Sequence, residues 1–341
     1  MQRPSVTMKD VAKAAKVSVM TVSRAFNADK SVNAESRKKI LAIAESLGYV
    51  FDATAANLRT QKSGFVAVTI PSINNANFAA TVDAISERLA QAGLQVLLGY
   101  SGYAIDREEE LIVQLLRRRP EAIVLTGGHH SPRARRLLEN AGIPVIEIWE
   151  LPADPLGHVV GFSNAQTMHG MVDHLVALGH KNICFVGGEE TGDQRGMDRR
   201  RGFIEAMTAH GLSPEHLFAA GPAPVSMREG ALAMAKLLDS FPQADAVVCV
   251  SDLIAFGALS ECQRRGIGVP EDIAIGGFGA YEIAAVAHPT ITTIDPQPRE
   301  IGYRTAALII DLLDPARDVA PRQRVEIDWR LLAAGSTSRR V

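Results

Sequence analysis

From residue 65 onward, short apolar runs alternate with amphipathic segments of helix length, and this alternation limits the possible folds more than any other feature of the sequence. The apolar runs fall in two series, at 65–70, 95–100, 122–126 and 144–148, and at 182–188, 245–251 and 272–278. The helical patterns lie at 78–92, 106–118, 131–141, 166–178, 197–210, 227–240 and 253–265. Strands separated by helices form parallel sheets with helices on both faces. We therefore expect two doubly wound α/β lobes, with a ligand site between them at the carboxyl ends of the strands.

The chain up to residue 50 has the pattern of three short helices instead. They are expected at 8–15, after the candidate N-cap Thr7, at 19–27, and at 34–47. The first two are separated by a three-residue break, a spacing typical of a helix-turn-helix, whose second helix enters the major groove of DNA. We assign residues 1–50 to a DNA-binding domain, 51–62 to a linker, and 63–341 to a ligand-binding and dimerisation domain.

The charge distribution supports this division. Residues 1–62 hold 11 lysines and arginines against 5 acidic residues, whereas the remainder holds 25 against 33. A small basic head on a larger acidic body indicates that the head alone meets a polyanion. A solvated helical face would carry the same excess of charge, so the distribution supports the prediction without proving it.

Three residues near the start of the second helix face outward and are candidates for reading base edges: Val19, Met20 and Arg24. The Arg24 guanidinium can make a bidentate contact to guanine, and the two apolar side chains can pack on thymine methyl groups. Four further residues suit phosphate oxygens: Thr7, Thr21, Ser23 and Asn27. The alternative is a three-helix bundle with an ordinary exposed face, for which two exposed apolar side chains beside an arginine are unusual.

These segments resemble the head of the LacI/GalR family of bacterial transcription regulators. The resemblance rests on MKDVAKAAKVSVMTVSRAFN at 8–27, with DVA, TVSR and the later LGY at the family spacing. It continues through HLVALGHKNICFVGG, RRRGF, SDLIAFGAL, GIGVPEDIAIGGF and PTITTI. It implies a helix-turn-helix head, a hinge helix and two lobes of the periplasmic-binding-protein type. The N-lobe would comprise about 63–163 plus 293–323, and the C-lobe about 164–292 plus 324–341.

The resemblance gives the linker a role. Its residues 52–58 match the family's hinge helix, which folds on DNA and inserts a leucine into the minor groove. That leucine would be Leu58, with Ala55 and Asn57 packing or contacting the DNA nearby. The head departs from the family at two positions. Phe51 stands where a proline is usual, and Lys16 stands where glycine is common, which would strain the lysine at a positive φ.

The resemblance also locates the effector site. The arginine of the RRRGF segment, Arg199, would anchor the effector, because a guanidinium fork matches a carboxylate or vicinal hydroxyls. Arg200 and Arg201 are interpreted as a surface cluster. Asp252 has two open interpretations, a helix cap or an acceptor for a ligand hydroxyl. Gly279 stands where relatives that bind neutral sugars or purines commonly have an aspartate, and this favours an anionic effector.

Several segments resemble the gluconate-utilisation repressor branch of the family, among them 71–80, 100–110, 125–150, 160–164 and 276–289. This resemblance implies a repressor released from its operator by a sugar acid such as gluconate or a ketogluconate. The candidate effector-binding residues are Asn74, Phe78, Tyr103, His129, Glu147, Phe162, Asn164, Arg199, Ser251 and Asp252. Aromatic rings can stack on the carbon face of a sugar while amides and acids bind its hydroxyls.

Other classes of protein are disfavoured. The sequence has no phosphate-binding loop, nucleophile elbow or HExxH motif, so we expect no enzyme and no cofactor. His129-His130 lacks partners at metal-ligand spacing, so we expect no metal site. The absence of an export signal and of an apolar membrane span indicates a cytoplasmic protein with free cysteines. Because a palindromic operator needs two heads, we expect a homodimer on near-palindromic double-stranded DNA, without a coiled-coil tail for tetramers.

Overall fold

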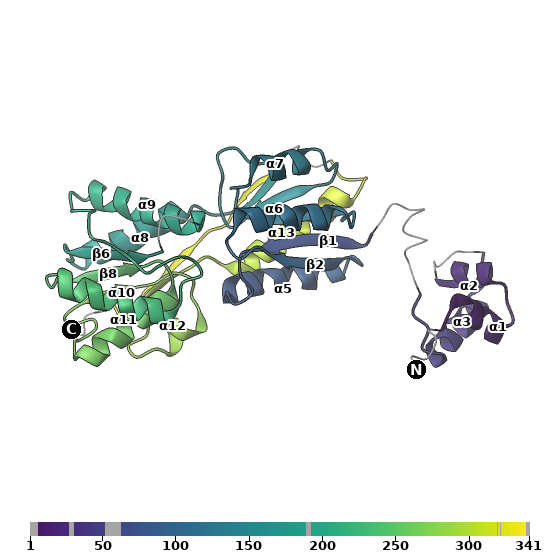
Figure 1. Ribbon diagram of the computed structural model, residues 1–341, viewed down its shortest axis with the longest axis horizontal. Helices are drawn as coiled ribbons and strands as arrows, with labels where there is room; N and C mark the ends of the chain where they lie inside the picture. The colour runs from purple at the N-terminus through teal and green to yellow at the C-terminus, as the bar shows by residue number, and fades with distance from the viewer. Residues whose placement is uncertain are drawn as a thin grey trace. The chain divides into compact units, whose positions relative to one another are not determined.

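The computed structural model describes residues 6–26, 31–51, 63–188, 192–318, 320 and 322–338. The chain divides into two compact units, Met1–Ser63 and Gly64–Val341, which are described separately. The second unit contains two lobes, each built on its own parallel sheet (Figure 1). No helix among the described residues is long and apolar enough to cross a membrane.

The first unit contains the three expected helices. They are α1 (Met8–Ala15), α2 (Val19–Phe26) and α3 (Ala34–Ser46). Their shared core consists of Val11, Ala12, Ala15, Val22, Ala25, Ile40 and Ala44. Side-chain oxygens hold the starts of the helices, because the backbone N–H of Thr21 donates to Ser18 Oγ (3.1 Å) and that of Ser36 to Asn33 Oδ1 (2.8 Å).

Both departures from the family pattern have visible structural effects. Lys16 ends α1 with φ 56° and ψ 43°, so the turn before α2 holds a lysine in the left-handed region. This conformation costs a residue with a Cβ roughly 1–2 kcal/mol. Phe51 stacks its ring on that of Phe26 at 4.8 Å between centroids, and Tyr49 meets Phe26 edge-on at 5.8 Å. At the end of the head, Phe51 is thus held by an aromatic contact with Phe26, the last residue of α2.

A six-stranded sheet forms the N-lobe. Its strands are β1 (Phe65–Ile70), β2 (Gln95–Tyr100), β3 (Ala122–Thr126), β4 (Val145–Ile148), β5 (His158–Gly161) and β11 (Arg324–Glu326). They lie in the order β11-β5-β4-β3-β1-β2, and every neighbouring pair is parallel. The helices are α5 (Ala76–Ala90), α6 (Ile105–Leu116), α7 (Pro132–Glu139) and α13 (Pro298–Leu313).

The apolar strands are continuous because both faces of the N-lobe sheet are covered. Along β3, Ala122 and Val124 belong to the core cluster that contains residues of α5 and α13. Ile123 and Leu125 belong to a separate cluster with residues of α6 and α7. Successive side chains therefore enter opposite cores, as the two-residue repeat of a strand requires.

The C-lobe repeats the plan with four parallel strands. They are β6 (Ile183–Gly187), β7 (Leu217–Ala219), β8 (Ala246–Cys249) and β9 (Ala274–Gly276), in the order β7-β6-β8-β9. Its helices are α8 (Asn164–Ala177), α9 (Gln194–Ala209), α10 (Met227–Ser240), α11 (Asp252–Arg265) and α12 (Glu282–Val286). Helix α9 packs on α8 closely enough that a Cβ on Gly202 would lie 2.2 Å from the Ala165 carbonyl oxygen.

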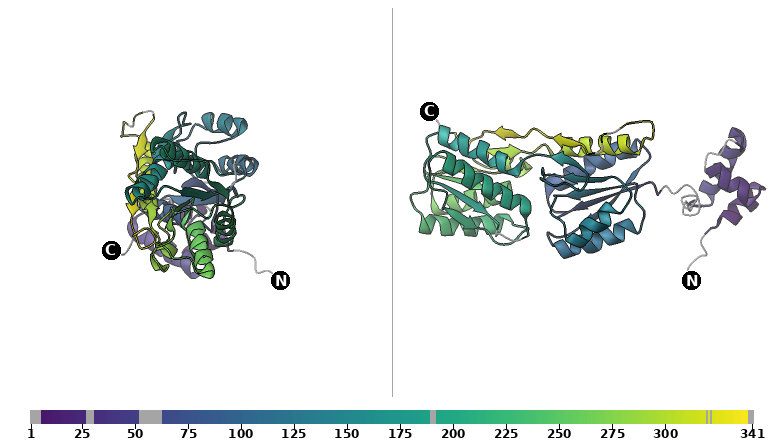
Figure 2. Two further views of the ribbon diagram at one scale, coloured as in Figure 1. Left: turned by 90° about the vertical axis from the view of Figure 1, so that its left-hand side faces the viewer. Right: turned by 90° about the horizontal axis from the view of Figure 1, so that it is seen from above.

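The last part of the chain runs along both lobes, as the yellow segment in Figure 2 shows. Strand β10 (Thr293–Asp295) pairs antiparallel with β12 (Arg330–Leu332). Strand β11, which lies between these two strands in the sequence, pairs instead with β5 of the N-lobe sheet. The expected assignment of residues from 324 onward to the C-lobe is therefore wrong for β11, whose backbone pairs with β5. The fold otherwise agrees with the expected pair of doubly wound lobes.

Candidate functional site

The start of α2 presents the side chains expected to read DNA. Val19 is 42% exposed and Met20 is 62% exposed, although both are large apolar residues. Arg24 is also exposed, whereas Val22 and Ala25 on the opposite face are fully buried. The helix thus has the orientation that the sequence predicts, and base reading by these three residues stays a prediction.

The candidate phosphate contacts have other partners within the head. Thr7 Oγ1 donates to Asp10 Oδ2 (2.7 Å), and Thr21 Oγ1 lies 2.9 Å from Ser18 Oγ. Both hydroxyls therefore help to fix the starts of the two helices, while Ser23 is half-buried in α2. Asn27, Ala55, Asn57 and Leu58 lie outside the described residues.

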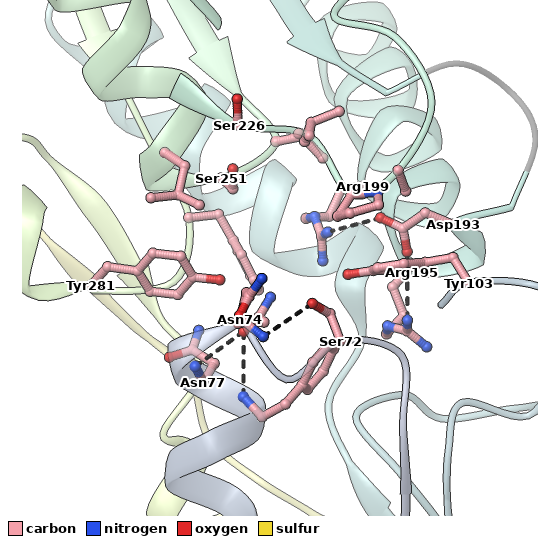
Figure 3. Close-up of a pocket in the computed structure, with 18 of the residues that line it drawn as sticks. Ser72, Asn74, Asn77, Tyr103, Asp193, Arg195, Arg199, Ser226, Ser251 and Tyr281 are labelled. Atoms are coloured by element: carbon pink, nitrogen blue, oxygen red, sulfur yellow. Dashed lines mark hydrogen bonds and ion pairs between the residues drawn. The ribbon is translucent and has the colours of Figure 1, made fainter. Parts of the chain in front are cut away.

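A cavity of about 250 Å³ lies between the two lobes of the second unit. Amides, hydroxyls, aromatic rings and two arginines line it, from both lobes (Figure 3). The N-lobe supplies Ser72, Asn74, Asn75, Asn77, Phe78, Tyr103 and Trp149, and the C-lobe supplies Asp193, Arg195, Arg199, residues 223–226, Val250, Ser251, Leu253, Phe278 and Tyr281. A small ligand bound here would contact both lobes at once.

Arg199 is held rigidly in this cavity. It extends from α9, is 9% exposed, and lies over the Phe278 ring with 4.3 Å from its guanidinium carbon to the ring centroid. Its Nη1 donates to Asn164 Oδ1 (2.6 Å), whose amide nitrogen donates in turn to the Trp149 carbonyl (3.0 Å). Burial lowers the pKa of Arg199. Its Nε is buried without a hydrogen-bond partner among the described residues.

Arg195 lies one helical turn before Arg199, on the same face of α9. Its Nη1 donates to the Thr126 carbonyl (3.3 Å), and its guanidinium lies 5.6 Å from the centre of the Phe78 ring. Asp193 lies between the two arginines, with 3.6 Å to Arg195 Nη2 and 3.8 Å to Arg199 Nη2 (Figure 3). Among the described residues that line the cavity, Asp193 is the one carboxylate, so the site has an excess of positive charge.

Two tyrosines point their hydroxyls toward one another across the cavity (Figure 3). Burial raises the pKa of both Tyr103 and Tyr281, so they are neutral hydrogen-bonding groups at physiological pH. Tyr103 and Trp149 have φ of 62° and 76°, in the left-handed region that is unfavourable for residues with a Cβ. Such strained residues cluster at ligand-binding sites.

Half of the ten predicted effector-binding residues line this cavity. They are Asn74, Phe78, Tyr103, Arg199 and Ser251. His129 lines a second, neighbouring cavity. The remaining four do not line either cavity, and their prediction as direct ligand contacts is not supported by the structure: Glu147, Phe162, Asn164 and Asp252.

Each of these four side chains has another place. Phe162 is fully buried behind the cavity wall, between the rings of Trp149 and Phe278. Asn164 positions Arg199 instead of facing the cavity. Glu147 is fully buried and accepts a hydrogen bond from the backbone N–H of Leu156 (2.8 Å).

Asp252 does not cap α11, and it is not among the residues that line the cavity. Ser251 caps α11 instead, because its Oγ accepts from the backbone N–H of Ile254 (3.4 Å). Asp252 is fully buried and accepts from the backbone N–H of Tyr281 (2.7 Å) and from Thr293 Oγ1 (2.6 Å). Burial raises its pKa to about 6. It therefore joins α11, the start of α12 and the crossover strand β10.

The glycine that replaces the usual aspartate leaves room for Tyr281. Gly279 has φ 126°, and a Cβ at this position would lie 2.7 Å from the Tyr281 ring. Sequence reasoning missed Tyr281, because only the turn at 279–281 brings its ring back over Gly279. It also left Arg195 out, although its spacing of four from Arg199 places both arginines on one helix face.

The histidine pair separates into two environments. His129 is exposed, whereas His130 is buried between Glu108 and Glu147. Among the described residues, no group of three or more His, Cys, Asp or Glu side chains is placed to hold a metal ion. His130 and its two carboxylates are therefore a buried charge network of the N-lobe.

Comparison with protein families agrees with both units. Residues 7–52 match the family described as bacterial regulatory proteins, lacI family, and residues 172–337 match the periplasmic binding protein-like domain. Together with the helix-turn-helix and the interlobe cavity, these matches define a DNA-binding transcription regulator with a domain of the type that binds small molecules.

Full-length relatives show the family. The HTH-type transcriptional regulator GntR of Pseudomonas aeruginosa is 34% identical over 97% of this chain and 95% of the relative. The regulator of the same name from Escherichia coli K12 is 32% identical over 88% of this chain and 89% of the relative. The chain belongs to the lacI family of bacterial regulatory proteins.

Solved structures are similar over most of the chain. A lacI-family regulator from Silicibacter pomeroyi is 41% identical and has a TM-score of 0.76 over 80% of this chain and 98% of that one. A second lacI-family regulator from the same organism is 30% identical and has a TM-score of 0.91 over 98% of this chain and 100% of that one. The names of these relatives all describe transcription regulators.

Proposed function

We propose that this protein is a repressor that leaves its operator when a sugar acid of the gluconate or ketogluconate type binds between the lobes. The observation that carries the proposal is the pair of buried arginines, Arg195 and Arg199, against one carboxylate, Asp193, among the described residues that line the cavity. A buried cation needs a partner, and the forked guanidinium favours a carboxylate. The buried Nε of Arg199 has no hydrogen-bond acceptor among the described residues, which supports an acceptor supplied by the ligand.

The remainder of the cavity suits the hydroxylated carbon chain of such an acid. The Asn74 and Asn77 amides can bind hydroxyls from one side, and Ser226 and Ser251 can do so from the other. The Phe78 ring offers an apolar face for the carbon chain. The resemblance of segments around these residues to the gluconate-utilisation repressor branch supports the same class of effector.

Two heads on a homodimer would bind a near-palindromic operator, and the effector would act on them through the lobes. Ligand contacts from both lobes favour one relative arrangement of the lobes, and DNA favours one spacing of the heads. If the two arrangements differ, effector and operator weaken each other's binding by the same factor.

Calorimetric titration of the full chain tests the effector class. The ligands are gluconate, 2- and 5-ketogluconate, 6-phosphogluconate, neutral hexoses and purines. We expect micromolar binding of a sugar acid, and a gel shift in which the same acid releases the protein from an operator selected out of random duplexes. Binding of neutral sugars or purines alone would contradict the proposal, because those ligands add no negative charge to the Asp193 carboxylate that the two arginines share.

Replacing Arg24 with alanine tests the DNA-reading helix. Loss of a bidentate contact to guanine costs about 1–3 kcal/mol, so discrimination at one base pair should fall by roughly tenfold or more. The measurement is a gel shift on the selected operator and on duplexes with single base-pair changes. Lys38→Ala is the matched control, because it removes an exposed positive charge from α3 and should weaken binding to all duplexes alike. Unchanged base preference in Arg24→Ala would mean that another element reads the operator.

A further inference from the structure

A second cavity of about 370 Å³ adjoins the first one. The two cavities share Tyr103 and Arg195, so they are neighbouring parts of one cleft. Besides these two, its lining includes Ser101, Glu108, Thr126, His129, Glu150 and Gln194. A six-carbon acid bound to Arg199 would leave this space to solvent.

Glu150 is the residue that points to a ligand in the second cavity. It is 7% exposed, and its Oε1 accepts from the backbone N–H of Gly128 (2.6 Å). Its Oε2 is buried and has no hydrogen-bond partner among the described residues. Burial raises the pKa of this carboxyl. A buried acceptor without a partner is unfavourable, so a ligand hydroxyl toward which the side chain turns would gain a hydrogen bond to Oε2.

Gly127 leaves the space beside Glu150 Oε2 without a side chain. Gly127 has φ 96°, and a Cβ there would lie 3.4 Å from Glu150 Oε2 and 2.8 Å from Arg195 Nη1. Any other residue at position 127 would therefore crowd Arg195 and come into contact with Glu150. The same nearby guanidinium disfavours a ligand ammonium, so the donor that suits Oε2 is an uncharged hydroxyl.

The two cavities differ in chemical character. The first presents Arg199 and an excess of positive charge, whereas the second presents two carboxylates, Glu150 and Glu108, beside the shared Arg195, with His129 and hydroxyl or amide groups around them. An acid with a hydroxylated extension matches both, with its carboxylate at the arginines and its far hydroxyls at Glu150. Small-molecule sites commonly enclose roughly 300–1,000 Å³, so occupation of both cavities is ordinary in size.

We propose, resting on the proposed function, that the preferred effector is an aldobionic acid, a sugar acid linked to a second sugar whose hydroxyl donates to Glu150 Oε2. Tyr103, which lies at the border of the two cavities, would contact the ligand near the glycosidic bond. The chemistry that distinguishes this effector from a simple hexonic acid is therefore located in the N-lobe, at the carboxyl ends of β3 and β4.

The test is calorimetry on the full chain with gluconate, cellobionate, maltobionate and lactobionate, for the wild type and two variants. We expect one aldobionate to bind at least tenfold more tightly than gluconate. Glu150→Gln should lower the affinity for that aldobionate by roughly tenfold or more, since a hydrogen bond to a charged group is lost, and should leave gluconate within about twofold. Glu139→Gln, an exposed change at the end of α7, is the matched control and should change neither affinity.

A second variant tests the cavity without changing Glu150. Gln194 lines only the second cavity and is exposed at the start of α9, so Gln194→Trp should fill that space and block aldobionates while gluconate still binds. Binding of gluconate but of no aldobionate by the wild type would overturn this inference and leave the proposed function standing. Aldobionate binding that both variants leave unchanged would also overturn it. Failure of every sugar acid to bind the wild type would overturn the proposed function itself.

Discussion

Replacing Arg199 with alanine is expected to abolish the response to a sugar acid while operator binding without the acid stays unchanged. Arg199 is almost fully buried, and Asn164 and the Phe278 ring fix its guanidinium in the cavity. Truncating one partner of a buried, hydrogen-bonded charge pair costs about 2–5 kcal/mol, which corresponds to a loss of about thirtyfold or more in affinity. The helix-turn-helix belongs to the other unit of the chain, so its DNA contacts do not depend on this side chain.

A gel shift across a range of effector concentrations measures this effect, with calorimetry to give the affinity directly. Arg201→Ala is the matched control, because Arg201 lies on the same helix but is exposed and pairs with Asp198 and Glu205 at the surface. It should respond like the wild type. A normal response by Arg199→Ala would show that the effector binds elsewhere, and the assignment of the cavity would then be wrong.

The second large effect is expected at His130, as a loss of stability. His130 Nδ1 lies 2.9 Å from Glu108 Oε2, and its Nε2 lies 3.5 Å from Glu147 Oε1. Burial alone would lower the pKa of His130, but its hydrogen bond to Glu108 and the charges of the two glutamates raise it from 6.5 to about 9. The imidazole of His130 is therefore protonated and positively charged at neutral pH. His130→Gln leaves two buried carboxylates without their cation, at a cost of about 3–5 kcal/mol in the free energy of unfolding.

The pH dependence of this cost identifies its origin. Because the pKa in the folded state is raised, the stabilisation by His130 is fully present below about pH 6.5 and is lost as the pH rises through about 9. Urea unfolding followed by tryptophan fluorescence measures it, since both tryptophans, Trp149 and Trp329, belong to the second unit. The difference between the wild type and His130→Gln should be largest near pH 6 and should shrink above about pH 9.

The adjacent histidine provides the control for this experiment. His129 is exposed, so His129→Gln should unfold like the wild type at every pH. A difference between the wild type and His130→Gln that is small, or that does not change between acidic and alkaline pH, would contradict the assignment of a charged His130.

The sequence predicted most of the long, buried elements, but it missed the 16-residue helix α13 and several short strands. Runs such as 122–126 are strands because helices cover both faces of the sheet, and covered strands are recognisable as continuous apolar segments. Strands β5, β7, β10, β11 and β12 have three or four residues each, too few for a periodic pattern. Strand β11 has exposed residues at both ends, so only its pairing with β5 reveals it.

The predicted effector-binding residues divide along a similar line. The family resemblance found Arg199 and the residues after β1, because sequence segments identify them directly. It did not separate residues that touch the cavity from those one layer behind, such as Asn164 and Phe162. That distinction depends on side-chain direction at the lobe boundary, which sequence spacing does not determine. The turn that brings Tyr281 over Gly279 depends on backbone geometry in the same way.

The ion pairs of Asp193 affect how tightly the cavity can bind an acid. Its carboxylate lies 3.6 and 3.8 Å from the two guanidinium groups, beyond the 2.7–2.9 Å of a strong charge-assisted hydrogen bond. An acid that approaches the arginines more closely would form the short charge-assisted hydrogen bonds that Asp193 does not form. It must, however, compete with the Asp193 carboxylate for the same two guanidinium groups. We therefore expect Asp193 to influence the effector concentration needed for release from the operator as much as the arginines do.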